Sequence, residues 1–212
     1  TGVQTCALPI LKIHLEKHIP IAAGMAGGST DAAATLKGMN RLFDLGCTLK
    51  DLMELGVKIG ADVPYCVMGG TALAEGIGEK LTPLAPAPDC YVLVAKPDIN
   101  VSTKYVYEHL DAQEIVKHPD IDGMVEAIAE ESLQGILDRM ENVLETVTVS
   151  AYPVIQTIKD RMKELGAINS LMSGSGPTVF GIFVEKDMAR RAYDKLEEEQ
   201  LAKQIFLTEF CE

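Results

Sequence analysis

Residues 24–30, which read Gly-Met-Ala-Gly-Gly-Ser-Thr, place three glycines and two hydroxyl side chains directly ahead of an alanine-rich run. Glycine permits positive φ and close approach of the main chain to a ligand, and the run that follows consists mainly of helix formers. The unpaired N–H groups and positive end of such a helix would point into the turn, an arrangement that binds anions. We therefore expect a tight turn at the start of a helix over residues 31–45. It is either a simple turn with an N-cap or a phosphate site.

Helix-type and strand-type segments alternate in both halves of the 212-residue chain. Alternating apolar and polar residues predict a strand at 11–16, and Thr48 followed by Asp51 predicts the N-cap of a second helix. A proline-rich linker at 86–89 separates the halves. The pattern predicts an α/β or α+β protein with two domains, 11–88 and 89–212. Further strands are predicted at 71–75, 91–95, 178–184 and 205–210, and further helices at 121–137, 153–165 and 188–200.

Charge and cysteine content exclude several classes of protein. The formal net charge is −12 and no basic cluster occurs, which argues against broad electrostatic binding of nucleic acid or an anionic membrane. No apolar run reaches the ~18–20 residues of a spanning helix. The five cysteines form no C-x-x-C pair, so reduced thiols of a cytoplasmic protein are expected rather than disulfides or a zinc site. Any phosphate must therefore be bound locally.

The first ten residues, 1–10, have neither an initiator Met nor a regular hydrophobic period. We interpret them as a foreign segment, and expect the natural chain to be cut just upstream of the 11–16 strand.

Two further segments carry candidate functional groups. Asp62 lies in Gly-Ala-Asp-Val-Pro, where a carboxylate at a break between elements is either a turn-forming Asx residue or a general base or metal ligand. Residues 170–178 form a second Gly/Ser loop that enters a strand, which by itself reads as a hairpin or strand-entry turn.

Taken together and in this order, residues 20–33, 60–64 and 173–178 resemble the second motif, the catalytic-aspartate segment and the third motif of the GHMP small-molecule kinases. Residues 27–33, 60–64 and 74–78 are most similar to the branch that phosphorylates the 2-hydroxyl of a cytidine-diphosphate-linked methylerythritol in the non-mevalonate isoprenoid pathway. Another GHMP kinase, such as a homoserine or mevalonate kinase, remains a nearer alternative. A catalytically silent nucleotide-binding module is an alternative from another class.

The resemblance implies an α+β fold of two domains: the C-terminal part of a ribosomal-S5-like, ATP-binding domain (11–88), then a ferredoxin-like domain (89–212). It implies ATP bridged by Mg²⁺, with no protein ligand assigned to the metal, and a small-molecule substrate in a monomer or homodimer. Asp62 would be the catalytic carboxylate, while Thr103 and Tyr107 would line the cytidine and diphosphate end of the substrate. The phosphate loop would consist of Pro20, Ala23, Gly24, Met25, Ala26, Gly27, Gly28, Ser29 and Thr30, and the third-motif loop of Ser173, Gly174, Ser175 and Gly176.

The sequence departs from the family pattern in two ways. Met25, Ala26 and Thr30 replace the usual Leu, Gly and Ser, and we expect Ala26 to have negative φ, because a Cβ at positive φ costs roughly 1 kcal/mol. The family's N-terminal strand carries a Lys beside the catalytic Asp and a Gly-Tyr-His segment that holds the cytosine. Neither occurs in this sequence, so we expect this chain not to turn over substrate by itself.

Overall fold

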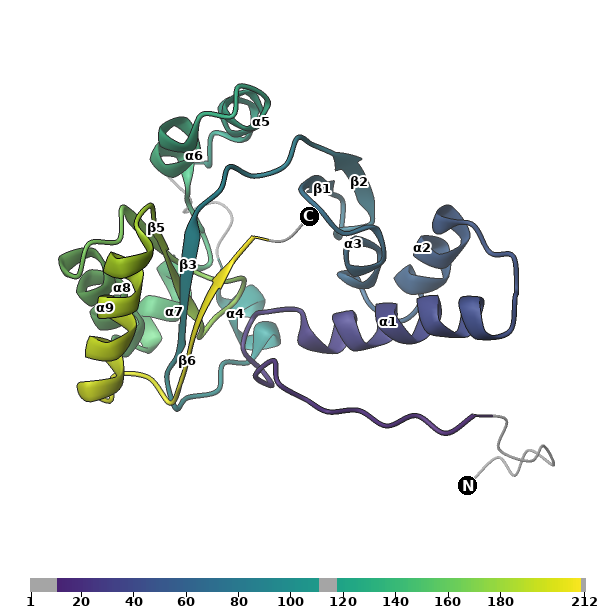
Figure 1. The fold of residues 1–212 in the computed structure, drawn as a ribbon, viewed down its shortest axis with the longest axis horizontal. Coiled ribbons are helices and arrows are strands. Elements are labelled where there is room, and N and C mark those ends of the chain that lie inside the picture. The colour runs from purple at the N-terminus through teal and green to yellow at the C-terminus, as the bar shows by residue number, and fades with distance from the viewer. Residues whose placement is uncertain (1–10, 111–117, 211–212) are drawn as a thin grey trace.

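The computed structural model describes residues 11–110 and 118–210, so the interpretation of residues 1–10 lies outside the described part. Figure 1 shows two bodies side by side: a helical N-terminal half that ends in a short hairpin, and a C-terminal half built on a sheet. The mixture confirms the predicted α+β class with two domains. The phosphate loop, residues 20–30, lies at the junction of the two halves.

In the described residues, the N-terminal half contains three helices and one hairpin. A small core of Ala33, Leu52, Val63 and Val67 joins the helices and holds the third of them against the N-terminal turns of the first. The elements are α1 (Gly27–Leu42), α2 (Leu49–Val57), α3 (Val63–Met68) and the antiparallel strands β1 (Ala72–Glu75) and β2 (Lys80–Pro83).

Helix α1 begins and ends earlier than predicted. It starts at Gly27 rather than at residue 31, so Ser29 and Thr30 lie in its first turn instead of capping it. The N-cap is Ala26, whose backbone is left-handed, and the helix ends at Leu42, just before Asp44 takes a φ of 46°. The turn at Ala26 therefore carries two glycines, which are poor helix formers, into the helix.

Helix α2 begins at the predicted cap. The Thr48 hydroxyl accepts a hydrogen bond from the Asp51 N–H at 3.2 Å, and the Asp51 carboxylate accepts one from the Thr48 N–H at 2.8 Å. This reciprocal capping box satisfies two N–H groups that the helix itself leaves unpaired. The pKa of the Asp51 carboxyl lies below its usual value because the carboxylate accepts hydrogen bonds from the Thr48 hydroxyl, which has the larger effect, and from the Thr48 N–H.

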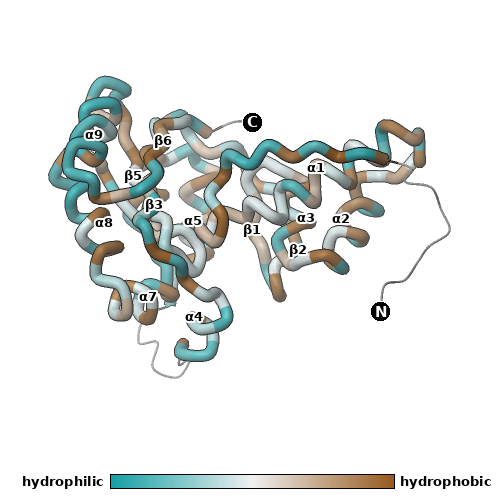
Figure 2. The backbone as a smooth tube through the Cα atoms, turned by 90° about the horizontal axis from the view of Figure 1, so that it is seen from below, coloured by the Kyte–Doolittle hydropathy of each residue, from teal (hydrophilic) through white to brown (hydrophobic). Residues whose placement is uncertain are grey.

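The predicted strand at residues 11–16 is wrong for the part of the chain that the structure describes, where this segment pairs with no strand. Leu11, Ile13 and Leu15 are exposed. In Figure 2 the segment alternates between hydrophilic and hydrophobic as it leads to the grey N-terminal trace. Alternation indicates a half-buried strand only when a neighbouring strand supplies hydrogen bonds.

The C-terminal half is a four-stranded antiparallel sheet of order β4-β5-β3-β6. Strands β3 and β4 are both antiparallel to β5, which lies between them, so the half has the split β-α-β arrangement of ferredoxin-like folds. Its strands are β3 (Tyr91–Lys96), β4 (Asn169–Met172), β5 (Val179–Phe183) and β6 (Gln204–Glu209). Its helices are α4 (Thr103–His109), α5 (Ile121–Ala129), α6 (Leu133–Arg139), α7 (Glu145–Ala151), α8 (Val154–Glu164) and α9 (Lys186–Glu198).

Both faces of the sheet are covered, which explains why β3 reads as a continuous apolar run. Leu93 and Ala95 face the main core, which α8 and α9 complete, whereas Val92 and Val94 face a second cluster on the opposite side. Successive side chains of a strand point to opposite faces, so these two sets separate cleanly. Most residues of α9 are hydrophilic, as the colouring in Figure 2 shows, and its buried residues are Ala189, Ala192 and Leu196.

The single helix predicted over residues 121–137 is two helices, α5 and α6. Glu131 takes a φ of 53°, and the Ser132 hydroxyl then accepts a hydrogen bond from the Gly135 N–H at 3.2 Å as a new N-cap. The two helices pack against each other, and the apolar period of the sequence does not reveal the break between them.

Candidate active site

The start of α1 presents unpaired N–H donors. Thr30 N–H donates to the Ala26 carbonyl at 2.8 Å, but within the described residues nothing accepts from the N–H groups of Gly27, Gly28 and Ser29. A Cβ added at Gly28 would meet no atom within 4 Å, so open space lies in front of this turn. Free donors at the positive end of a 16-residue helix can bind an anion.

The expectation of negative φ at Ala26 is wrong. Ala26 has a φ of 48° and ψ of 26°, and Ala22 has a φ of 51°. The left-handed backbone at Ala26 turns the chain into α1 and leaves its carbonyl as the acceptor for both the N–H and the hydroxyl of Thr30, at 2.8 and 3.1 Å. The alanine thus adopts a left-handed conformation that glycine adopts more readily, at a cost of roughly 1 kcal/mol.

The third-motif loop, residues 173–176, lies directly against the phosphate loop. The Ser173 hydroxyl donates to the Gly24 carbonyl at 2.8 Å. Gly24 has a φ of 69°, and a Cβ there would come within 3.0 Å of the Gly176 carbonyl oxygen and still closer to that of Ser173. Met25 packs beside the apolar cluster on the sheet face that contains Val92 and Val94. The structure therefore brings together two predicted segments that the sequence separates by about 150 positions.

Helix α4 approaches the other side of the third-motif loop. The hydroxyl oxygens of Thr103 and Ser175 lie 2.8 Å apart and share a hydrogen bond. Tyr107 follows one helical turn later on the same face, and 61% of its surface is exposed. Thr103 is thus joined to the third-motif loop, whereas the exposed Tyr107 ring leaves a face open on which a planar group could stack.

Asp62 is the N-cap of α3 and is exposed to solvent. Within the described part of the chain, no hydrogen bond or ion pair reaches its carboxylate. Cys66, one helical turn further along α3, has its Sγ 3.6 Å from the Thr30 hydroxyl in the first turn of α1. Asp62 therefore begins a helix whose next turn contacts the first turn of α1, while its own carboxylate makes no contact there.

Two domain families match the sequence. Residues 3–70 match the GHMP kinases N terminal domain, and residues 124–203 match the GHMP kinases C terminal domain. The chain is 58% identical over 200 residues to the 4-diphosphocytidyl-2-C-methyl-D-erythritol kinase of Lachnoclostridium phytofermentans, covering 94% of this chain and 69% of that protein. It is 57% identical to the protein of the same name from Lachnospira eligens, with the same coverage of 94% and 69%. This chain belongs to the 4-diphosphocytidyl-2-C-methyl-D-erythritol kinase family.

Solved structures agree with membership of the 4-diphosphocytidyl-2-C-methyl-D-erythritol kinase family. A crystal structure of 4-(cytidine 5'-diphospho)-2C-methyl-D-erythritol kinase matches with a TM-score of 0.77 at 33% identity, over 92% of this chain and 68% of that one. Homoserine kinase from Cytophaga hutchinsonii matches with a TM-score of 0.75 at 21% identity, over 92% and 67%, and shares the fold alone. The GHMP kinase fold predicted from the motifs is therefore confirmed.

In this member of the 4-diphosphocytidyl-2-C-methyl-D-erythritol kinase family, sequence reasoning missed one cation beside the phosphate loop. The Lys17 ammonium donates to the Gly27 carbonyl at 2.8 Å and pairs with the Asp31 carboxylate in the first turns of α1. Only 23% of the Lys17 side chain is exposed. The signal in the sequence is a lone lysine three positions before Pro20, directly after the segment that alternation predicts to be a strand.

Two findings concern what the described residues lack. None of the helices in residues 11–110 and 118–210 is long and apolar enough to cross a membrane. The same ranges contain no group of three or more His, Cys, Asp and Glu side chains arranged to hold a metal ion.

Proposed function

We propose that this chain transfers the γ-phosphate of ATP to the 2-hydroxyl of 4-(cytidine 5'-diphospho)-2-C-methyl-D-erythritol, a step of the non-mevalonate isoprenoid pathway. The observation that carries the proposal is the contact of the phosphate loop, which leads into the free N–H groups of α1, with the third-motif loop, in a chain 58% identical to a kinase of that name. Phosphoryl transfer depends mainly on positioning and charge neutralisation, and this junction supplies positioned donors.

The phosphates of ATP would lie on the phosphate loop at the start of α1. The N–H groups of Gly27, Gly28 and Ser29 would donate to phosphate oxygens, and the Ser29 hydroxyl, which has no partner in the described residues, would add a further donor. Lys17 would contribute a positive charge from the side of the loop, in exchange for part of its ion pair with Asp31. Gly28 leaves the space that a phosphate needs.

The donor set fits a magnesium ion that arrives with the nucleotide. Mg²⁺ keeps several waters and is commonly bound through phosphates with one or two carboxylates, so it does not require a preformed cluster of protein ligands. Asp31, in the first turns of α1, is a carboxylate that could complete its coordination. Bound there, the ion would neutralise charge on the transferred phosphate.

Asp62 would act as the general base. As the substrate oxygen forms its bond to the γ-phosphorus, its proton passes to the Asp62 carboxylate, and the bond to the β-γ bridging oxygen breaks with its electron pair leaving on ADP. The position suits this role because the carboxylate is exposed and has no competing partner among the described residues. On the substrate side, the Thr103 hydroxyl would face the diphosphate, and the exposed Tyr107 ring would stack on the cytosine.

The test is an ATP-consumption assay with the cytidylated substrate, and with homoserine and mevalonate for comparison. It should be run on the 212-residue chain and on a version extended with the upstream coding sequence, because the expectation that this chain alone is inactive stays a prediction. Turnover of homoserine or mevalonate instead would favour another GHMP kinase. Nucleotide binding without turnover in either version would favour the silent module.

The substitution Asp62→Asn tests whether Asp62 is the general base, in whichever of the two versions of the chain turns over substrate. We expect kcat to fall by about 10²–10⁴-fold, while the Kd for ATP changes by no more than a few-fold, because the base acts on the transition state. Asp44→Asn is the matched control: Asp44 is exposed at the far end of α1, and asparagine tolerates its φ of 46°. Equal turnover by Asp62→Asn and Asp44→Asn would remove Asp62 from the mechanism.

A further inference from the structure

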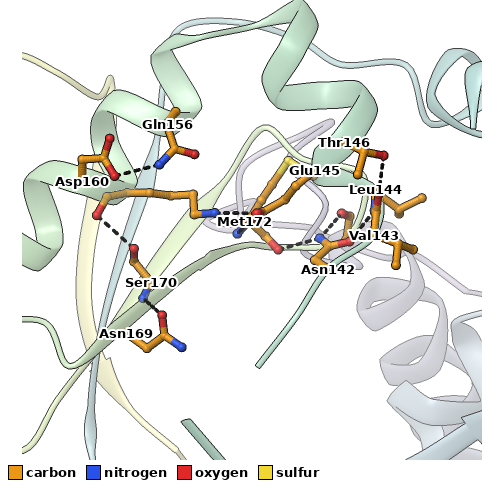
Figure 3. A network of polar contacts seen from close by, with 12 residues as sticks. Asn142, Val143, Leu144, Glu145, Thr146, Gln156, Asp160, Asn169, Ser170 and Met172 are labelled. Atoms are coloured by element: carbon orange, nitrogen blue, oxygen red, sulfur yellow. Dashed lines mark hydrogen bonds and ion pairs between the residues drawn. The ribbon is translucent and has the colours of Figure 1, made fainter. Parts of the chain in front are cut away.

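A polar network adjoins the third-motif loop. Figure 3 shows it between helices α7 and α8 and the end of strand β4. At its base, the Glu145 carboxylate forms an ion pair with the Lys159 ammonium, and only 10% of the Lys159 side chain and 18% of the Glu145 side chain are exposed. The other Glu145 oxygen accepts from the Met172 N–H at 2.7 Å.

Asn142 connects this network to the loop itself. It lies between α6 and α7, and its side-chain amide donates to two carbonyls, those of Met172 and Gly174, each at 2.8 Å. Its amide oxygen accepts from the Leu144 N–H at 3.0 Å, which fixes the direction in which the NH₂ group points. One side chain therefore binds the backbone on both sides of Ser173, whose hydroxyl holds the Gly24 carbonyl.

The third-motif loop is the shared support of both halves of the proposed site. Ser173 contacts the phosphate loop through Gly24, and Ser175 contacts α4 through Thr103. The Thr148 hydroxyl donates to the Ser175 carbonyl at 3.3 Å, so α7 holds the loop at a second point. Any shift in the loop must therefore reach the phosphate loop and α4 together.

We infer that Asn142 is a positioning residue for phosphoryl transfer: by fixing the third-motif loop, it sets the conformation of the phosphate loop, to which it makes no hydrogen bond within the described residues. The consequence for catalysis rests on the proposed function, whereas the consequence for loop conformation rests on the contacts alone. Because Glu145 and Lys159 anchor the end of β4 below it, Asn142 acts on the loop from a fixed base.

Asn142→Asp is the informative substitution because it keeps shape and the acceptor for Leu144 while removing both donors. It also places a carboxylate oxygen against the Met172 and Gly174 carbonyls, so acceptors face acceptors and the loop must move. Asn169→Asp is the matched control. Asn169 is the first residue of β4, at the strand end remote from the loop, and its side-chain amide likewise donates to a backbone carbonyl, that of Leu137, at 2.8 Å.

Three measurements are made on each variant: urea unfolding, amide hydrogen exchange of the peptides that contain residues 20–30 and 173–176, and the Kd for the Mg²⁺ complex of a non-hydrolysable ATP analogue. For Asn142→Asp we expect about tenfold faster exchange in both peptides and about tenfold weaker binding. A tenfold change in either equilibrium corresponds roughly to the net free energy of one hydrogen bond between uncharged groups. For Asn169→Asp we expect neither change, even if its unfolding free energy falls by a similar amount.

Equal exchange of residues 20–30 in the two variants would overturn the inference. If Asn142→Asp does not fold, Asn142→Ala removes the same donors without the added charge, and the same comparison applies to Asn169→Ala. If the unsubstituted protein does not bind the nucleotide analogue, the proposed function fails. The exchange measurement still decides whether Asn142 positions the loop.

Discussion

Replacing Gly24 with alanine should separate the two loops that form the site. Gly24 has a φ of 69°, and an added Cβ would lie 3.0 Å from the Gly176 carbonyl oxygen, 3.1 Å from its nitrogen and still nearer to the Ser173 carbonyl oxygen. All three atoms belong to the backbone, so no side-chain rotation relieves the clash. The two loops must move apart by on the order of 1 Å to restore ordinary van der Waals contact.

The cost of this substitution has two parts that can be measured separately. The left-handed backbone costs alanine roughly 1 kcal/mol, and overpacking against a rigid neighbour adds about 1–3 kcal/mol. Gly46→Ala is the control for the first part, because Gly46 has a φ of 67° and a methyl group added there would meet nothing within 4 Å. Urea unfolding should therefore give a loss of about 1 kcal/mol for Gly46→Ala and about 2–4 kcal/mol for Gly24→Ala.

The same pair of variants separates stability from ligand binding. A displacement of about 1 Å in a positioning group can cost up to about 10²-fold in rate, so Gly24→Ala should weaken binding of the ATP analogue and lower turnover, whereas Gly46→Ala should leave both unchanged. Equal unfolding free energies for the two variants, or unchanged nucleotide binding by Gly24→Ala, would refute the reasoning that contact with the third-motif loop shapes the phosphate loop.

The remaining predictions concern local features. Ala26→Gly should raise the unfolding free energy by about 0.5–1 kcal/mol in urea, because it relieves the φ of 48°; a loss of stability would contradict the strain argument. Thr48→Ala should cost about 1 kcal/mol at neutral pH by loss of the cap. The pKa of Asp51 is lowered in the folded state, so its contribution is present above the unfolded value of about 3.9 and is lost as the pH falls through the folded pKa; the Thr48→Ala penalty should therefore shrink in acid, which unfolding at pH 3 and pH 7 would check. Burial raises the pKa of the Cys90 thiol, so labelling at pH 8, mapped by mass spectrometry, should be much slower at Cys90 than at the half-buried Cys66, and equal rates would contradict it.

Features that depend on neighbouring residues in the sequence could be predicted well. The capping box of α2 needs only Thr48 and Asp51, three positions apart, and both of its hydrogen bonds are present. Strand β3 could be found because a strand buried on both faces must be apolar throughout. Strand β4 (Asn169–Met172) and helix α7 (Glu145–Ala151) were not predicted. Each is too short to show a clear hydrophobic period, and tertiary packing stabilises it.

The candidate site could be predicted as a set of residues but not as an arrangement. The glycine-rich segments marked the phosphate loop and the third-motif loop, yet nothing local indicates that the Ser173 hydroxyl donates to Gly24. The prediction of negative φ at Ala26 is wrong because the turn into α1 overrides alanine's own preference. Asn142 carried no signal at all, since one asparagine between two helices is most often a simple turn residue.

The contact between Ser173 and Gly24 joins positions 149 residues apart, and this separation has a consequence for how the protein is made. At about 5–20 residues per second, a ribosome needs roughly 7–30 s to proceed from one position to the other. Throughout that interval the phosphate loop exists without the backbone that supports it, because the third-motif loop has not been synthesised. A nascent chain should therefore acquire the ability to hold nucleotide late and in a single step, when strand β5 joins the sheet and the loop before it closes on Gly24.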